Sequence, residues 1–170
     1  MSTENIKRVV LAGGCFWGVE AYYKQLKGVV KTTVGYTNGN IANPSYEDLL
    51  NKKATHSEAC EIYYDPKVIS LKIILTHLFR FIDPTSLNKQ GNDVGIQYRT
   101  GIYYTNKEDE KIIIDFINDM QKEYDKPIQV EVAKEDGYYL AETYHQDYLD
   151  KNPGGYCHVD LNLIKENEKK

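Results

Sequence analysis

The sequence is poor in cysteine, with only three in 170 residues. An odd and small number excludes a closed disulfide scaffold, so at least one thiol is spare. No apolar run exceeds about four residues, whereas a membrane-spanning helix needs about 20. The first residues include Glu4 and lack the long apolar core of a secretory signal. We therefore expect no membrane partner and a cytoplasmic location, where thiols stay reduced.

Positive charge is not in excess either, since 21 Lys and Arg face 25 Asp and Glu for a net charge of −4. This balance argues against a nucleic-acid partner bound through a basic face. Hydrophobic residues at 41% and charged residues at 27% are typical of a globular chain rather than a disordered one. We expect a single domain over residues 1–170, with the charged residues 165–170 as a frayed tail.

The spacing of apolar residues predicts alternating strands and helices. Strands are expected at residues 8–12, 29–36, 57–64, 97–104 and 128–133, and helices at 15–26, 46–50, 71–82 and 105–124. Ser70 is expected to cap one helix, and Thr105 with Glu108 to form a capping box for another. The order of the six main elements predicts an α+β fold, a ferredoxin-like split βαβ two-layer sandwich with a mixed sheet and an irregular C-terminal segment. The polar residues 83–94 are typical of a long functional loop.

Cys15 stands where a predicted strand passes into a helix through Gly13 and Gly14. The N-terminus of a helix has unpaired N–H groups and a partial positive charge, and both stabilise a thiolate. We therefore expect the pKa of Cys15 to fall below the free value of about 8.5, which would make it a reactive thiol. The alternative is a buried cysteine that packs as a small apolar residue.

Cys60 and Glu58 share one face of the predicted strand 57–64, together with Ile62. Cys60 is therefore expected to be an inert core residue. Glu58 points to the same apolar side, where burial would raise its pKa and keep it protonated as a proton donor near pH 7. The alternative is that Glu58, near the strand end, reaches water.

Cys157 lies in a segment rich in Gly and Pro, residues 152–158, which is expected to form a mobile, exposed loop. A thiol in such a loop does not help a core. It could swing onto another thiol or simply remain an exposed cysteine, and the local sequence leaves both readings open.

The run 14–18, Gly-Cys-Phe-Trp-Gly, resembles the active-site motif of the A-type peptide methionine sulfoxide reductases. The similarity continues in order along the chain from about residue 10 to residue 160. Further matching motifs lie at residues 35–37, 43–46, 56–59, 64–66, 90–95, 97–99, 144–146 and 152–157. The five-residue motif around Cys15 alone is moderately specific, whereas the ordered set of motifs is very specific.

The resemblance implies reduction of methionine S-sulfoxide, either free or in peptides and proteins, with thioredoxin as reductant and with no metal or other cofactor. It implies the following roles: Cys15 as nucleophile, Glu58 as acid, Tyr46 and Tyr98 as hydroxyl donors, Asp93 as a supporting carboxylate, Phe16 and Trp17 as the pocket for the substrate methyl group, and Cys157 as resolving thiol. A Cys15 sulfenic acid would then give way to a Cys15–Cys157 disulfide.

Two other functions compete with this reading. The first is a Cys–His acyl transferase or hydrolase, for which any of the four histidines could be the base. These are His56, His77, His145 and His158. The second is a non-catalytic metal or binding module, although the cysteine and histidine spacing does not match a zinc site.

Overall fold

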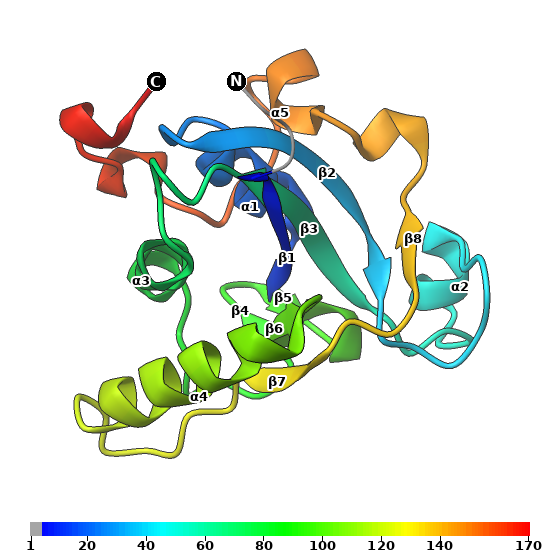
Figure 1. Ribbon diagram of the computed structural model, residues 1–170. Coiled ribbons are helices and arrows are strands. Elements are labelled where there is room, and N and C mark those ends of the chain that lie inside the picture. Colours follow the sequence, from blue (N-terminus) through cyan, green and yellow to red (C-terminus); the bar gives the residue numbers. More distant parts are fainter. Residues whose placement is uncertain (1–4) are drawn as a thin grey trace.

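The computed structural model describes residues 5–170, and its centre is one mixed six-stranded sheet. The strands are β1 (Lys7–Gly13), β2 (Val29–Thr37), β3 (Ser57–Tyr64), β6 (Thr100–Tyr104), β7 (Glu131–Lys134) and β8 (Tyr138–Leu140). They lie in the order β7-β6-β1-β3-β2-β8, and all neighbours are antiparallel except β6 and β7. Because β3 lies between β1 and β2, the unit β1-α1-β2 is a split βαβ. The predicted α+β class is confirmed, with a sheet that curls strongly (Figure 1).

Three helices contribute to the main core with residues from one face of this sheet. They are α1 (Phe16–Tyr23), α3 (Leu71–Phe81) and α4 (Lys107–Gln121). The strands alternate, so Leu11 and Ile62 join this core while their neighbours point to the other side. The shorter elements are α2 (Tyr46–Leu50), β4 (Lys89–Gln90), β5 (Asp93–Val94), η2 (Ile96–Tyr98), η3 (Thr143–His145), α5 (Tyr148–Lys151), η4 (Leu161–Leu163) and η5 (Glu166–Glu168).

The predicted starts of two helices had different outcomes. The Ser70 hydroxyl accepts a hydrogen bond from the Ile73 backbone N–H, so the predicted cap of α3 is confirmed. The predicted capping box of α4 is wrong, because Asn106 precedes this helix and makes no side-chain cap. The Thr105 hydroxyl instead accepts a hydrogen bond from Arg8, 3.0 Å away. A tertiary contact therefore replaces the local one.

The C-terminal tail, expected to fray, is docked in the structure. Both oxygens of the Glu168 carboxylate accept hydrogen bonds from Arg80 of α3, at 2.8 and 2.9 Å. Lys169 forms an isolated β-bridge with Leu26, just beyond α1. The segment that follows Cys157 is therefore held against α1 and α3, close to the start of β2 (Figure 1). The charges of residues 165–170, taken from the sequence alone, did not predict contacts with Arg80 and Leu26.

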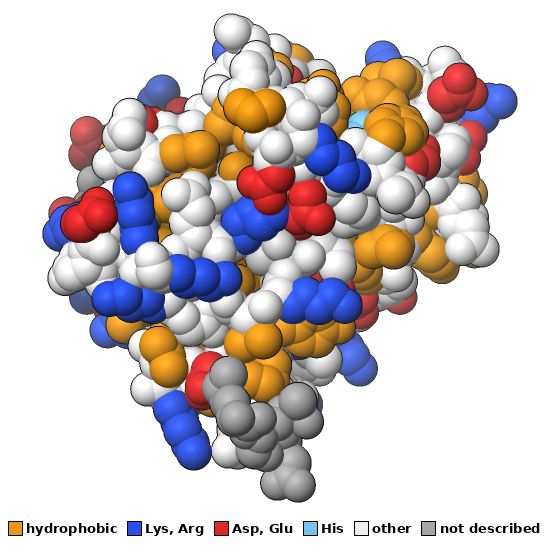
Figure 2. Space-filling view, turned by 90° about the horizontal axis from the view of Figure 1, so that it is seen from above, with side chains coloured by type: hydrophobic (Ala, Val, Ile, Leu, Met, Phe, Trp, Pro, Cys, Tyr) orange, Lys and Arg blue, Asp and Glu red, His pale blue; other side chains and the backbone are white. Residues whose placement is uncertain are grey.

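None of the helices within residues 5–170 combines the length and the apolar composition that a membrane-spanning segment requires. The face seen in Figure 2 carries side chains of both charges, with apolar groups between them.

Candidate active site

Cys15 occupies the junction between β1 and α1, as predicted. Gly14 has a left-handed backbone with φ of +89°, and a β-carbon there would lie only 2.8 Å from Gln90 and from His158. Glycine is therefore needed for this tight turn. Cys15 is the residue immediately before α1, is 7% exposed, and forms no disulfide. The thiol is thus nearly enclosed at the N-terminus of a helix.

Glu58 lies on β3, where it pairs with Tyr36 of β2, and it is 1% exposed. One carboxyl oxygen accepts a hydrogen bond from the Phe16 backbone N–H at 3.3 Å, at the first turn of α1. The other oxygen has no partner among the described residues. Burial raises the pKa of Glu58 to about 8, so the carboxyl is largely protonated at neutral pH. The predicted inward orientation is confirmed, and the alternative of a carboxylate in water is excluded.

The predicted low pKa of the Cys15 thiol is wrong for this structure. Burial raises the pKa of Cys15, the nearby charge of Glu58 raises it further, and the backbone N–H of Trp17 only partly opposes them. A single helix N-terminus favours one negative charge, and here two acids share it. Because the thiol is buried away from water and lies near Glu58, its neutral form is favoured at rest.

Tyr46 and Tyr98 are brought to this site by α2 and η2. Tyr46 is the first residue of α2, and its backbone N–H donates to the Glu142 carboxylate at 2.9 Å. Tyr98 ends η2, rather than lying in the predicted strand. Burial and then the charge of Glu58 raise the pKa of both phenols, with further contributions from Cys15. Both tyrosines therefore remain protonated and can donate hydrogen bonds near Cys15 and Glu58.

Asp93 and Cys157 lie on the C-terminal side of the site. An Asp93 carboxylate oxygen accepts a hydrogen bond from the Tyr156 hydroxyl at 3.0 Å. The Cys157 Sγ packs on the first turn of α1, because a β-carbon added at Gly18 would lie 3.1 Å from it. The thiol is half-buried and contacts the Val159 carbonyl oxygen at 3.2 Å. The expected exposure is confirmed for residues 152–154 and for Tyr156, whereas Cys157 and His158 at the end of the segment are half-buried.

Phe16 and Trp17 belong to an aromatic cluster around His145. Trp17 stacks on Tyr148 with ring centroids 3.7 Å apart and planes 8° apart. Its Nε1–H donates to His145 Nδ1 at 3.0 Å, so this imidazole carries its proton on Nε2. Burial lowers the pKa of His145, which keeps the ring neutral. Sequence reasoning missed this cluster, and the available signal was the motif 144–146, whose histidine was considered only as a base.

None of the four histidines pairs with the Cys15 thiol in the part of the chain that the structure describes. His145 binds Trp17, His77 contacts the Tyr22 hydroxyl at 2.6 Å, and His158 contacts the Gly13 carbonyl oxygen at 2.7 Å. The side-chain Nδ1 of His56 has no hydrogen-bond partner among residues 5–170. Residues 5–170 also contain no group of three or more metal-ligating side chains. The structure therefore does not support the alternative functions of a Cys–His acyl transferase or hydrolase and of a metal-binding module.

Cys60 lies in the main core and is fully buried, as predicted. Burial raises its pKa well above the ordinary value, with smaller contributions from Glu20 and Glu61. A sealed neutral thiol of this kind packs as an apolar residue.

Comparisons of the sequence and of the structure with known proteins point to the same family. Residues 7–170 match the family described as peptide methionine sulfoxide reductase. The peptide methionine sulfoxide reductase MsrA of Clostridium perfringens strain 13 is 53% identical over 156 residues, which cover 92% of this chain and 99% of that protein. The structure is similar to Mxr1 from Saccharomyces cerevisiae in reduced form, with a TM-score of 0.88, 35% identity and 94% coverage of both chains. It is also similar to Mxr1 in complex with Trx2, with a TM-score of 0.62, 27% identity, and coverage of 86% and 87%.

Proposed function

Because the chain belongs to the peptide methionine sulfoxide reductase family, we propose that it reduces the S epimer of methionine sulfoxide through Cys15, both in the free amino acid and in peptides and proteins. One observation carries the chemical assignment. The buried carboxyl of Glu58, with a pKa of about 8, contacts the first turn of the helix that Cys15 precedes. A neutral acid beside a thiol is the arrangement that oxygen transfer from a sulfoxide needs.

In the first step, the Cys15 sulfur attacks the sulfoxide sulfur. The S–O oxygen gains negative charge, which hydrogen bonds from Tyr46 and Tyr98 stabilise while Glu58 delivers a proton. Glu58 then recovers the proton that the Cys15 thiol releases. The oxygen then moves from the substrate sulfur to the Cys15 sulfur while the transient sulfur–sulfur bond breaks. The products are methionine, reduced by two electrons, and a sulfenic acid on Cys15. Asp93 is the supporting carboxylate at the edge of this site.

The neutral resting state of Cys15 fits this sequence of events. A permanent thiolate would repel the growing negative charge on the substrate oxygen and would need water or a cation beside it. Here burial keeps the thiol protonated, so charge forms only as the substrate accepts a proton. Glu58 can both give and regain that proton because its pKa of about 8 lies near neutral pH.

The methyl group of the substrate is proposed to contact Phe16 and Trp17. Phe16 is buried against Tyr36, with ring centroids 5.7 Å apart, and Trp17 is fixed by its hydrogen bond to His145 and its stacking on Tyr148. Such a rigid apolar wall excludes water from the reacting sulfur.

In the second step, the Cys157 thiol attacks the Cys15 sulfenic acid, which forms a disulfide and releases water. A dithiol then returns two electrons and two protons and restores both thiols. We propose thioredoxin as this dithiol, with support from the similar Mxr1 structure that contains Trx2. All three cysteines are free in the resting structure, which suits the cytoplasm as the proposed location.

The proposal is tested by incubating the purified protein with each sulfoxide epimer of methionine and an excess of dithiothreitol. We expect methionine from the S epimer and none above the blank from the R epimer, which serves as the matched control. No methionine from the S epimer would refute the proposal. Methionine from both epimers at equal rates would refute its stereochemical part.

A further inference from the structure

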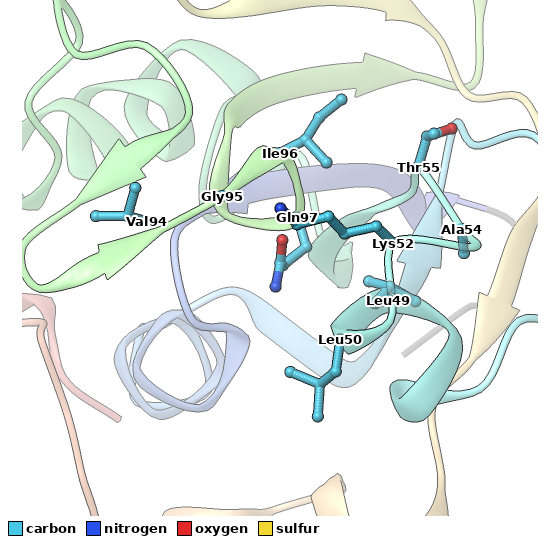
Figure 3. Close-up of a pocket in the computed structure, with 9 residues that line it drawn as sticks. All are labelled: Leu49, Leu50, Lys52, Ala54, Thr55, Val94, Gly95, Ile96 and Gln97. Carbon is cyan, nitrogen blue, oxygen red and sulfur yellow. The ribbon is translucent and has the colours of Figure 1, made fainter.

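An open groove lies between the chain around α2 and the segment that joins β5 to η2. Its volume is about 550 Å³. It is lined by Leu49, Leu50, Lys52, Ala54, Thr55, Val94, Gly95, Ile96 and Gln97 (Figure 3). None of these residues has a part in the chemistry proposed above.

The groove shares its walls with the proposed active site. Tyr46 begins the helix that carries Leu49, and Tyr98 directly follows Gln97. Leu49 and Ala54 are buried in one apolar cluster with Phe16, against which Trp17 and Tyr46 also pack. The lining of the groove and the proposed catalytic site therefore share one apolar cluster.

The two walls are fixed to each other by Arg99. Its guanidinium donates to the backbone carbonyl of Thr55 on one wall at 2.9 Å and to that of Ile96 on the other wall at 3.0 Å. A third bond reaches the Asn38 carbonyl at 3.0 Å. A groove held in this way is preformed, so a ligand does not have to order it.

The chemistry of the lining suits a polypeptide. Leu50, Val94 and Ile96 expose between 43% and 68% of their surface, which is unusual for three neighbouring large apolar side chains. The lining also holds the Gln97 amide and the Lys52 ammonium group. Lys52 is the only charged residue in the lining, which contains no carboxylate.

From these observations we propose that the groove binds the residues that flank methionine sulfoxide in an extended polypeptide substrate. An apolar side chain of the substrate contacts Leu50 and Ile96, the Gln97 amide bonds its backbone, and Lys52 favours an acidic side chain. This inference rests on the proposed reductase function. It adds a distinction between substrates, because free methionine sulfoxide is too small to occupy both the catalytic site and the groove.

The test compares kcat/KM for free methionine S-sulfoxide with that for two peptides, identical except for a Glu or a Lys near the methionine sulfoxide. The parent should prefer the Glu peptide. Leu50→Glu should lower kcat/KM for both peptides relative to the free amino acid, by roughly tenfold. Lys52→Glu should reverse the preference between the two peptides, which a merely structural effect would not do.

The matched control for Leu50→Glu is Ile114→Glu on α4, since Ile114 is 43% exposed, comparable with 51% for Leu50, and does not line the groove. This variant should keep the parent's ratio of peptide to free activity. The inference is overturned if Leu50→Glu and Lys52→Glu leave that ratio and the Glu/Lys preference unchanged, or if Ile114→Glu changes them equally. Failure of the parent to reduce free methionine S-sulfoxide would instead refute the reductase function itself.

Discussion

Strand β3 brings a thiol close to a buried carboxyl in two places, and the two places differ in how well the carboxyl is satisfied. At one end Glu58 lies beside Cys15, with one long hydrogen bond and one oxygen without a partner among the described residues. Near the middle Glu61 follows Cys60, and its carboxylate contacts Arg8, Thr33 and Tyr63 at 2.5 to 3.0 Å. A carboxylate with its full set of partners is structural, whereas an unsatisfied one is available for proton transfer.

The two thiols repeat this contrast. Burial raises the pKa of both, so neither is a resting thiolate. Cys15 nevertheless faces proton donors at a helix N-terminus, whereas Cys60 is sealed in the main core. Burial alone therefore does not define a reactive cysteine, and the neighbouring donors decide the difference.

The largest effect is expected when the thiols themselves are changed. Cys15→Ser should abolish reduction of methionine S-sulfoxide, because a hydroxyl cannot accept the oxygen as a sulfenic acid. Cys60→Ser, the matched variant in the core, should keep the parent's rate and lower the free energy of unfolding by about 1–3 kcal/mol. Methionine formation and thermal unfolding measure the two outcomes. Activity that survives in Cys15→Ser would remove the distinction between the two sites.

The resolving step offers the next largest effect. Cys157→Ser should still form one equivalent of methionine per enzyme, while cycling with thioredoxin should fall to the background. The half-buried position of Cys157 on the first turn of α1 supports this order of events. A single-turnover assay and a thioredoxin-coupled assay separate the two steps. Full cycling in this variant would make Cys60 the resolving thiol and would contradict its inert role.

Changing each carboxyl in turn compares the two sites directly. Glu58→Gln should slow the single-turnover rate by about 10²–10⁴, the usual contribution of a general acid, since the amide has no proton to release. Glu61→Gln should keep the parent's rate but lower the free energy of unfolding by roughly 1–3 kcal/mol, because it weakens the bond to Arg8. Equal rates for the parent and Glu58→Gln would take the acid role away from Glu58.

The sequence predicted much of this comparison, and its failures have physical causes. Periodicity in residues 57–64 was sufficient to place Glu58 and Cys60 on the helix-covered side of the sheet. Periodicity did not show that Glu61 is only 8% exposed and bonded to Arg8, because that bond joins segments far apart in the chain.

The prediction of a low pKa for Cys15 was wrong for a related reason. The local sequence shows that a helix begins after Cys15, but it does not show that the folded chain buries this thiol and places Glu58, from another strand, beside it. The position of Cys157 against Gly18 and the docking of Glu168 on Arg80 also depend on tertiary contacts. The local sequence encodes the helices, the strands and their buried faces. The pKa of a buried group depends instead on the residues from distant parts of the chain that pack around it.

The last comparison concerns the dependence of stability on pH. Burial raises the pKa of Glu58 from 4.5 to about 8, so between these values the folded protein holds a proton that the unfolded chain has released. This contribution to stability is complete below about pH 4.5 and is lost as the pH rises through about 8. Glu58→Gln removes this linkage. The difference in unfolding free energy between Glu58→Gln and the parent should therefore change in favour of the variant by roughly 1.4 kcal/mol per pH unit from pH 5 to 8.

Glu61→Gln is the control for this measurement, because it leaves Glu58 in place and should keep the parent's loss of stability across the same pH range. Denaturant unfolding at several pH values, with activity recorded in parallel, connects stability to mechanism. Activity should decline on the alkaline side with a midpoint near pH 8, where Glu58 loses the proton that it donates. If Glu58→Gln and the parent showed the same pH dependence of stability, Glu58 would be ionised in the folded protein, and the contrast with Glu61 would not hold.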